Sequence, residues 1–372
     1  MRPKLTNLTI CGFKTIRELR DFQPGPINVL IGANGAGKSN FVSFFRLLGA
    51  MLGSPGDLQN HVAVSGGAHA LLHRGPETTR EMQASVDMET GLGDIEYQFR
   101  LSYAAGDTLI FADERMRLRP VAPAPDTPWI ELGTGHREAR LVEGGGGRHP
   151  TAGTLLSLLL NQCVVHQFHN TSPTARIRGK WPVTDSRLLK EDAGNLAPVL
   201  LRLREQDPEY YRRITETLRL IMPFFADFEL HAHHGAVLLQ WRERGSDLIF
   251  DVSQASDGML RTMALVTLLG QPLGNQPAIL ILDEPELGLH PYAINIVAGL
   301  LRAASLHTQV IVATQSTAFV NCFEPEDIVV VNRTGMESTF ERLSAEKLKD
   351  WLDEYSLSEL WEKNVIGGRP GG

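Results

Sequence analysis

The stretch Gly32-Ala33-Asn34-Gly35-Ala36-Gly37-Lys38-Ser39-Asn40 follows directly on the apolar run 27–31. It matches the pattern G-x-x-x-x-G-K-[ST] and lies between a short apolar strand and the start of a helix, where this pattern predicts a phosphate-binding loop. Glycines let backbone N–H groups converge on phosphate oxygens without a clashing Cβ, and the helix start presents further N–H groups to the same anion. The chain is therefore predicted to bind a nucleotide.

The polar residues of this loop have separate expected roles. Lys38 is expected to reach the β- and γ-phosphates, and the Ser39 hydroxyl is expected to bind Mg²⁺. Residue chemistry at this point leaves ATP and GTP both open. The residues expected to contact the nucleotide from this loop are Gly32, Asn34, Gly35, Gly37, Lys38, Ser39 and Asn40.

A second motif lies at the end of the apolar run 279–282, where Asp283 and Glu284 follow abruptly. Two carboxylates directly after an apolar strand are expected where they face a metal-bound triphosphate. Asp283 is expected to hold Mg²⁺ together with Ser39, and Glu284 is expected to orient and deprotonate the attacking water. This pair predicts hydrolysis in addition to binding.

The composition excludes several classes of protein. The chain has 372 residues, 42% hydrophobic and 21% charged, as in ordinary globular proteins. Its apolar runs are too short to cross a bilayer and its first residues lack a secretory signal, so no membrane attachment is expected. Three scattered cysteines fit a reducing, cytoplasmic location. A net charge of −7 gives no overall attraction to nucleic acid, so any such contact must come from a local basic face.

In the first half of the chain, residues 82–103 alternate with a period of two, which predicts antiparallel strands. Glycine and proline predict a surface connection at 53–76 and a mobile insertion at 120–150. No long heptad pattern appears, so no coiled-coil arm is expected. Further strands are expected at 5–10, in a segment ending near Phe22, at 109–111 and at 116–118.

In the second half, apolar residues on one face predict helical structure over 185–225. The remainder alternates strands and helices in the style of a doubly wound sheet. Strands are expected at 237–241, 248–252, 278–282, 310–313 and 328–331, with helices from about Tyr292 and over 345–352.

A third motif, Ala255-Ser256-Asp257-Gly258-Met259, precedes an apolar helix ahead of the acidic pair. Ser256 is expected to cap this helix, and Gly258 permits close approach. At this position the motif matches the signature loop of the ABC superfamily, usually written LSGGQ. Together with the loop pattern GxNGxGKSN and the continuation Asp283-Glu284-Pro285-Glu286-Leu287-Gly288-Leu289-His290-Pro291, it makes residues 5–332 resemble ABC-type ATPase heads of the RecF/SMC-like group, related to OLD-family nucleases and AAA family ATPases.

This resemblance implies an α/β fold, namely an ABC-type P-loop NTPase head with a mixed RecA-like core sheet, an antiparallel β lobe and a helical signature lobe. The whole chain is expected to form one two-lobed ATPase domain, without a coiled-coil arm or a TOPRIM nuclease domain. Its parts are expected at 1–160 for the phosphate loop and β lobe, 161–265 for the signature lobe, and 266–372 for the acidic-motif half with its C-terminal tail.

The resemblance also implies ATP and Mg²⁺ as cofactors and a homodimer, or a higher oligomer, as the working state. Ser256 and Gly258 of one subunit would contact the γ-phosphate bound by the other, so that two ATP molecules are sandwiched head to tail. A glutamine at a strand end should contact the metal and water, and Gln167 fits this place, with His169 as the rival. The switch position, usually histidine, is Gln315, which cannot become cationic and therefore predicts slow turnover.

Other basic residues leave alternatives open. Lys14 and Arg17 lie where related heads contact nucleotide, and surface charge is the competing interpretation. Arg176, Arg178 and Lys180 would either contact nucleic-acid phosphates or belong to a solvated loop.

The interpretation that follows is an ATP-hydrolysing sensor or scaffold in DNA repair or anti-phage defence, working with a separate nuclease or effector protein. One alternative is an ATP-stabilised clamp with negligible turnover. Another is the nucleotide-binding subunit of a transporter, against which Gln315 and the Ser-Asp-Gly signature weigh.

Overall fold

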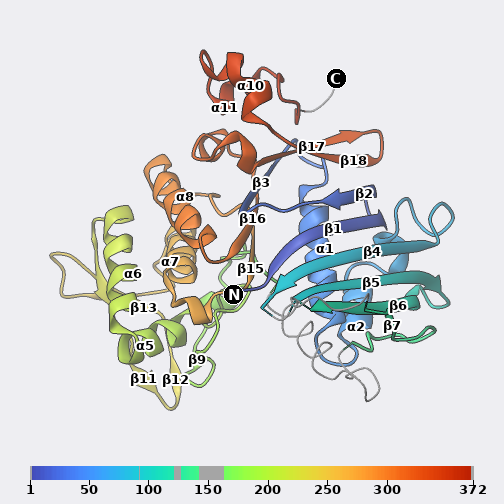
Figure 1. Cartoon of the computed structure of the whole chain (residues 1–372). Helices are drawn as coiled ribbons and strands as arrows, with labels where there is room; N and C mark the ends of the chain where they lie inside the picture. The colour runs from blue at the N-terminus through green and yellow to red at the C-terminus, as the bar shows by residue number, and fades with distance from the viewer. Residues whose placement is uncertain (1, 92, 121–126, 142–162, 370–372) are drawn as a thin grey trace. The chain divides into compact units, whose positions relative to one another are not determined.

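The computed structural model describes residues 2–91, 93–120, 127–141 and 163–369, which form two compact units. Unit 1 combines residues 1–164 with residues 324–372, and unit 2 consists of residues 165–323. The chain therefore leaves unit 1 and returns to it near its C-terminus, as the colours of Figure 1 follow.

An antiparallel sheet forms the larger part of unit 1. Its strand order is β2-β1-β4-β5-β6-β7, and every neighbouring pair is antiparallel. Inward-facing side chains alternate with more exposed ones along β4, as the period of two predicts. The strands are β1 (Lys4–Phe13), β2 (Ile16–Phe22), β4 (Glu81–Thr90), β5 (Gly93–Ala104), β6 (Thr108–Pro120) and β7 (Ile130–Glu131).

The two strands predicted at 109–111 and 116–118 are one strand, β6. Its pairing with β5 shifts register between Arg100 and Leu101, which face Asp113 and Phe111 respectively. Ala112 is thus the extra residue of a bulge, and such a bulge breaks the sequence alternation without ending the strand.

The strand before the phosphate loop is β3 (Ile27–Ile31), and all five of its residues are buried. It pairs in parallel with β17 (Ile328–Thr334), which in turn pairs antiparallel with β18 (Glu337–Arg342). The loop leads into α1 (Lys38–Met51), which lies along one face of the antiparallel sheet (Figure 1). Edge-to-face contact between Phe13 and Phe44, with ring centres 5.7 Å apart, fixes this packing.

The segment predicted as a surface connection at 53–76 instead contains two helices, α2 (Asp57–Val64) and α3 (Ala68–Leu71). Leu58 and Val62 are buried one helical turn apart. The glycines and prolines lie around these helices and not within them, and they concealed the apolar spacing.

The insertion predicted to be mobile at 120–150 is only partly described, since residues 121–126 and 142–150 lie outside the described residues. Residues 127–141 pack on the sheet, because Leu132 and Leu141 are buried there. Fully buried Glu114 accepts a hydrogen bond from His136 Nε2 at 2.7 Å. This described part therefore packs against the sheet and supplies a partner for a buried carboxylate, while the mobility of the insertion stays a prediction.

Unit 2 contains the parallel strand pair β15 (Ile279–Asp283) and β16 (Gln309–Ala313), and the packed helices α6, α7 and α8. The positions of β15 and β16 confirm the predicted strands at 278–282 and 310–313. The main helices are α5 (Leu196–Gln206), α6 (Pro208–Ile221), α7 (Asp257–Gly270) and α8 (Pro291–Ser305). The shorter elements are β9 (Trp181–Pro182), β10 (Phe225–Phe228), β11 (Ala232–His233), β12 (Ala236–Val237), β13 (Gln240–Glu243), β14 (Ile249–Asp251) and α9 (Thr317–Val320).

The helical region predicted at 185–225 begins only at Leu196. Ahead of it, the fully buried Asn195 donates hydrogen bonds to the carbonyls of Asp185 and Leu188. Its side-chain oxygen accepts from the N–H of Lys190. A side chain that pairs the loop backbone in this way favours a folded loop over a helix.

The chain returns to unit 1 through β17 and β18 and ends in α10 (Ala345–Leu352) and α11 (Leu357–Glu362). Trp361 on α11 is buried, whereas Trp351 on α10 is exposed. No helix among the described residues is long and apolar enough to cross a membrane.

Candidate functional site

The phosphate loop of unit 1 leaves no room for side chains at two of its glycines. Gly37 has a φ of 119°, and a Cβ at this position would overlap Ser338 Oγ. A Cβ on Gly32 would overlap the carbonyl oxygen of Val331 on β17. The loop backbone is therefore held against β17 and β18, and only glycine permits that approach.

Lys38 is already folded over the loop. Its side chain is buried, and Nζ donates hydrogen bonds to the carbonyls of Gly32 at 2.5 Å and Ala33 at 3.1 Å. Ser39, Asn34 and Gly35 are exposed. The cation thus lies inside the loop while the hydroxyl proposed for Mg²⁺ remains accessible.

Asn40 supports the loop from behind. Its Nδ2 donates to Thr15 Oγ1 at 2.7 Å, in the turn between β1 and β2. Ser338 Oγ on β18 lies 2.7 Å from the same Thr15 oxygen and 2.6 Å from the carbonyl oxygen of Ala36. Arg333 on β17 donates to the carbonyl of Gly35 at 2.9 Å.

The sequence analysis missed Thr15, Ser338 and Arg333. Ser338 and Thr15 are 323 positions apart, and a lone hydroxyl on a strand carries no local signal. The pairing of β17 with β3, and of β18 with β17, brings Arg333 and Ser338 to the loop, whereas Thr15 reaches it from the turn between β1 and β2.

The basic residues near the first strands are engaged by neighbours. Lys14 Nζ donates to Ser43 Oγ on α1 at 2.7 Å, and burial, followed by the charge of Arg46, lowers the pKa of Lys14. Arg17 pairs with Glu337 at 2.9 Å on the surface. Neither geometry favours nucleotide contact over the surface-charge alternative.

In unit 2, the ends of β15 and β16 gather the predicted acids and amides. Asp283 is buried, and its Oδ2 accepts a hydrogen bond from Gln167 Nε2 at 3.3 Å. Gln167 Nε2 also lies 3.1 Å from His169 Nδ1. Gln167, the candidate preferred over His169, therefore contacts the acid.

Glu284 occupies an uncommon backbone conformation. Its φ is 46°, and its N–H donates to the carbonyl of Ala313 at the end of β16. Gln315 Nε2 donates to Glu284 Oε1, so the residues predicted as base and switch are in direct contact. A non-glycine residue held at positive φ is typical of functional sites.

A third acid, Glu286, lies beside this pair. It is buried, and Thr314 Oγ1 donates to its Oε1. Burial raises the pKa of the Glu286 carboxyl, and its Oε2 has no hydrogen-bond partner among the described residues. The sequence analysis placed Glu286 only in the connecting loop after the acids.

The signature loop caps its helix as predicted. Ser256 is the N-cap of α7 and accepts a hydrogen bond from the N–H of Met259 at 3.3 Å. A Cβ on Gly258 would lie 2.9 Å from the carbonyl oxygen of Gly288, so a side chain there would collide with the loop after the acids. Ser256 is exposed at the surface of unit 2.

Two arginines hold the signature segment, and neither was identified from the sequence as doing so. Arg178 donates to the carbonyls of Val252 and Ala255 and lies 3.3 Å from Asp257. Its side chain is 13% exposed, which disfavours both alternatives considered for it, a phosphate contact and a solvated loop.

Arg261, on the first turn of α7, connects three segments. It donates to the carbonyls of Phe168 at 3.3 Å and His169 at 3.0 Å, next to Gln167. It also donates to the carbonyl of Leu287 at 3.2 Å, just beyond the acids. The signature helix is thereby tied to the segments that carry Gln167 and Glu284.

These donor sets fit the cofactors that the sequence predicts. Hydroxyl, carboxylate and amide oxygens are the ligands that Mg²⁺ prefers. The crowded glycines and buried ammonium of unit 1 are suited to a phosphate group. The unpaired buried oxygen of Glu286 is consistent with a cation or water beside it.

Comparison with known proteins gives two kinds of match. A family model described as "AAA domain, putative AbiEii toxin, Type IV TA system" matches residues 27–321. No curated protein matches the chain significantly.

Solved structures with a similar fold include an SMC head bound to the C-terminal winged-helix domain of ScpA. It is 15% identical, has a TM-score of 0.61, and the alignment covers 93% of this chain and 99% of that one. A second is the SMC head with an extended coiled coil bound to the C-terminal domain of ScpA, from Pyrococcus furiosus. It is 14% identical, has a TM-score of 0.58, and the alignment covers 95% and 99% of the two chains.

These likenesses show the fold of an ABC-type ATPase head, as predicted, and the family match indicates an ATP-binding ATPase. Since the family model spans most of the sequence, this chain belongs to the AAA-domain family described as putative AbiEii toxin of the Type IV TA system.

Proposed function

We propose that this protein binds ATP with Mg²⁺, hydrolyses it slowly, and pairs head to tail with a second copy when ATP is bound. The observation that carries the proposal is the arrangement at the ends of β15 and β16. There Gln167 contacts Asp283, and Gln315 contacts Glu284. An ATP-binding scaffold without hydrolysis has less need of a carboxylate held in this way.

The roles follow from the chemistry of each side chain. Lys38 binds the β- and γ-phosphates, while Ser39, Asp283 and Gln167 hold the metal directly or through water. Mg²⁺, when bound, would neutralise charge on these phosphates. Glu284 accepts the proton of the attacking water.

Gln315 supports hydrolysis in a different way from a histidine. Its amide donates a hydrogen bond but adds no positive charge, and in this structure it donates to Glu284. The amide orients the carboxylate with one of its two N–H groups, which leaves only the other for a phosphate oxygen. This arrangement supports slow turnover.

The second subunit completes the site in this proposal. Ser256 is exposed at the start of α7, and the helix start carries unpaired N–H groups beside Gly258. These groups suit the γ-phosphate bound by the partner subunit, so ATP would join the two copies. A single subunit would then be a poor ATPase.

The biological setting is proposed from family analogy. The two SMC heads are described in complex with a domain of another protein, ScpA, which makes a protein partner plausible for this head also. We propose that a separate nuclease or effector acts with this subunit in anti-phage defence or DNA repair, in the cytoplasm.

A second candidate function is an ATP-stabilised clamp with negligible turnover. The neutral amide of Gln315 at the switch position favours it, since an amide adds no positive charge to stabilise the γ-phosphate during hydrolysis. Equal and negligible turnover of the native protein and Glu284→Gln would support the clamp over the ATPase.

The decisive experiment is mass photometry of Glu284→Gln with and without ATP and Mg²⁺. We expect an ATP-dependent doubling of mass that is absent in Glu284→Gln combined with Lys38→Ala, and also absent when it is combined with Ser256→Arg. A mass that does not respond to ATP would refute ATP-driven pairing.

A further inference from the structure

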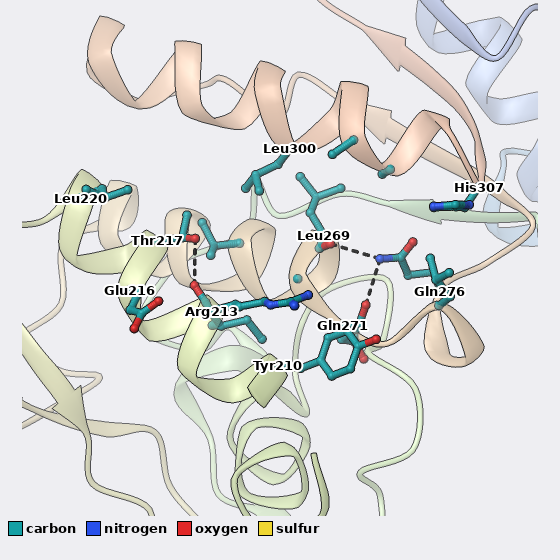
Figure 2. Close-up of a pocket in the computed structure, with 16 residues that line it drawn as sticks. Tyr210, Arg213, Glu216, Thr217, Leu220, Leu269, Gln271, Gln276, Leu300 and His307 are labelled. Atoms are coloured by element: carbon teal, nitrogen blue, oxygen red, sulfur yellow. Dashed lines mark hydrogen bonds between the residues drawn. The ribbon is translucent and has the colours of Figure 1, made fainter. Parts of the chain in front are cut away.

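A groove of about 540 Å³ lies on unit 2, away from the predicted nucleotide residues. Its walls are α6 and α8, and the C-terminal half of α7 forms its floor. Figure 2 shows Leu220, Thr217 and Arg213 along α6, with Leu300 on α8 across from them. All of these residues belong to one unit.

The groove is elongated. The residues that α6 contributes extend from Tyr210 to Leu220, a distance of about 15 Å, or roughly three helical turns. Small residues, Gly270, Ala303 and Ala304, line the region between the helices. Small side chains leave room for a backbone to approach closely, which a bound helix requires.

Large apolar side chains of the groove are exposed. Leu220 is 58% exposed and Leu273 is 40% exposed, and both line the groove. A groove lined by exposed leucines is suited to an amphipathic helix, whose apolar stripe occupies positions i, i+3, i+4 and i+7.

The charge of the rim selects among such helices. Arg213 is exposed, and its guanidinium has no ion pair or hydrogen bond among the described residues, only the ring of Tyr210 at 5.6 Å. The acid on the same wall, Glu216, already has Arg212 at 3.9 Å. Exposed His307 adds a second basic group on the α8 side.

Two amides lie beneath the rim. Gln276 donates its amide to the carbonyls of Leu269 and Gln271. The side-chain oxygens of Gln276 and Gln271 are buried and have no hydrogen-bond partner among the described residues, so they are not accessible to a partner. The groove therefore offers an exposed cation, Arg213, beside an apolar base.

From these contacts we infer that the α6–α7–α8 groove binds an amphipathic helix of a partner protein, with a carboxylate on that helix paired to Arg213. The occupant has an apolar stripe about three turns long. Its binding does not require ATP hydrolysis, so the inference stands apart from the proposed function.

The position of α7 gives this binding a consequence for the signature loop. The helix begins at Asp257, directly after Ser256, and it ends at Gly270 on the groove floor. An ideal Cβ on Gly270 would lie 2.6 Å from Ile214 Cγ1, so α7 and α6 are closely packed. A helix seated on this floor therefore touches the element that presents the signature.

The test uses the full chain and a phage-displayed library of helical peptides about 14 residues long (roughly four turns). Enriched peptides are synthesised with a fluorophore, and their binding is measured by anisotropy. We expect apolar residues at helical spacing with one acid. Ala304→Arg, which fills the groove, should weaken binding by at least about tenfold.

A charge exchange locates the contact. Arg213→Glu should weaken the binding of the acidic peptide by about tenfold. A peptide with lysine in place of its acid should bind that variant with recovered affinity. Arg244→Glu, a charge reversal at an exposed arginine of the same unit outside the groove, is the matched control and should have little effect. Thermal unfolding of each variant establishes that the fold is retained.

Three results would overturn the inference. The library yields no enriched peptide, or the enriched peptides bind Ala304→Arg and Arg213→Glu as tightly as the native chain. Alternatively, mass photometry without nucleotide shows a dimer that Ala304→Arg abolishes, in which case the occupant is a second copy of this chain.

Discussion

The two units hold their functional residues by different means. In unit 1, a chain of neutral side chains, Ser338, Thr15 and Asn40, lies behind the phosphate loop, and one guanidinium contact, from Arg333 to the carbonyl of Gly35, is added to it. In unit 2, the guanidinium groups of Arg178 and Arg261 hold backbone carbonyls around the signature and the acids. The contacts in unit 1 hold the backbone of the phosphate loop and keep its lysine inside it.

The residues of unit 2 that we propose as catalytic are more exposed than the phosphate-loop lysine. Glu284 is only partly buried and Gln315 is exposed, and each has the other as its polar contact. Arginine contacts to carbonyls can exchange between neighbouring acceptors, whereas a hydroxyl wedged against a glycine cannot move without moving the backbone. We therefore expect residues of unit 1 to set the affinity for ATP and residues of unit 2 to set the rate of turnover.

The largest expected effects separate these two properties. Lys38→Ala should weaken ATP binding on the order of 100-fold, about 2.7 kcal/mol, because it removes a charged contact to phosphate. Glu284→Gln should preserve binding and lower turnover by about 10² to 10⁴-fold, because it removes the base. Fluorescent-nucleotide titration and phosphate release measure the two effects, and loss of binding in Glu284→Gln would break the division between the units.

A smaller effect is expected at the arginine that connects the segments of unit 2. Arg261→Ala leaves the carbonyls of Phe168, His169 and Leu287 without this donor, so turnover should fall by about tenfold, given about 1.5–3 kcal/mol for a charged hydrogen bond. ATP affinity should change less than twofold or so.

Arg212→Ala is the matched control for this variant, because it removes an exposed guanidinium with only a surface ion pair. Arg261→Lys keeps the charge but not the forked geometry, so it should be intermediate. If Arg261→Ala changed affinity and left turnover intact, the assignment of control to unit 2 would be wrong.

The hydrogen-bonded hydroxyls of Ser338 and Thr15 in unit 1 should show the opposite pattern, a change in ATP affinity without a change in turnover. Ser338→Ala should raise the KM for ATP by about three- to fivefold with kcat unchanged, since a neutral hydrogen bond contributes about 0.5–1.5 kcal/mol. Thr15→Val should act similarly, and the double variant should be less than additive because the two hydroxyls touch. Thr339→Ala, on the exposed side of the same strand, is the control.

The sequence predicted the parts of the fold and site that depend on local pattern. The phosphate loop, the acidic strand end and the signature cap are each contiguous, and each needs particular residue types at fixed spacing. The period of two in β4 and the buried run of β3 also follow from nearest-neighbour geometry.

What the sequence did not predict depends on contacts between distant segments. Ser338 reaches the phosphate loop only through the pairing of β18 with β17 and of β17 with β3. Arg178 and Arg261 bind carbonyl oxygens, and because every residue supplies a carbonyl, the partner leaves no trace in the sequence. The helices in 57–71 were missed for another reason, since their apolar spacing lies between glycines and prolines.

The smallest effect concerns the acid sensitivity of unit 2. His166, beside Gln167, is buried, and desolvation lowers its pKa from 6.5 to about 4. The unfolded chain therefore binds this proton more tightly, so the free energy of unfolding should fall as pH drops from 6.5 towards 4. His166→Gln, which stays neutral, should lose less stability between pH 7 and pH 5 in urea unfolding than the native chain, whereas exposed His234→Gln should match the native chain. Nucleotide affinity, which we expect to depend on unit 1, should be retained at pH values where turnover already declines. A parallel loss of ATP affinity and turnover on acidification would show instead that both units respond to the same proton. The division between affinity in unit 1 and turnover in unit 2 would then be weaker than their contacts indicate.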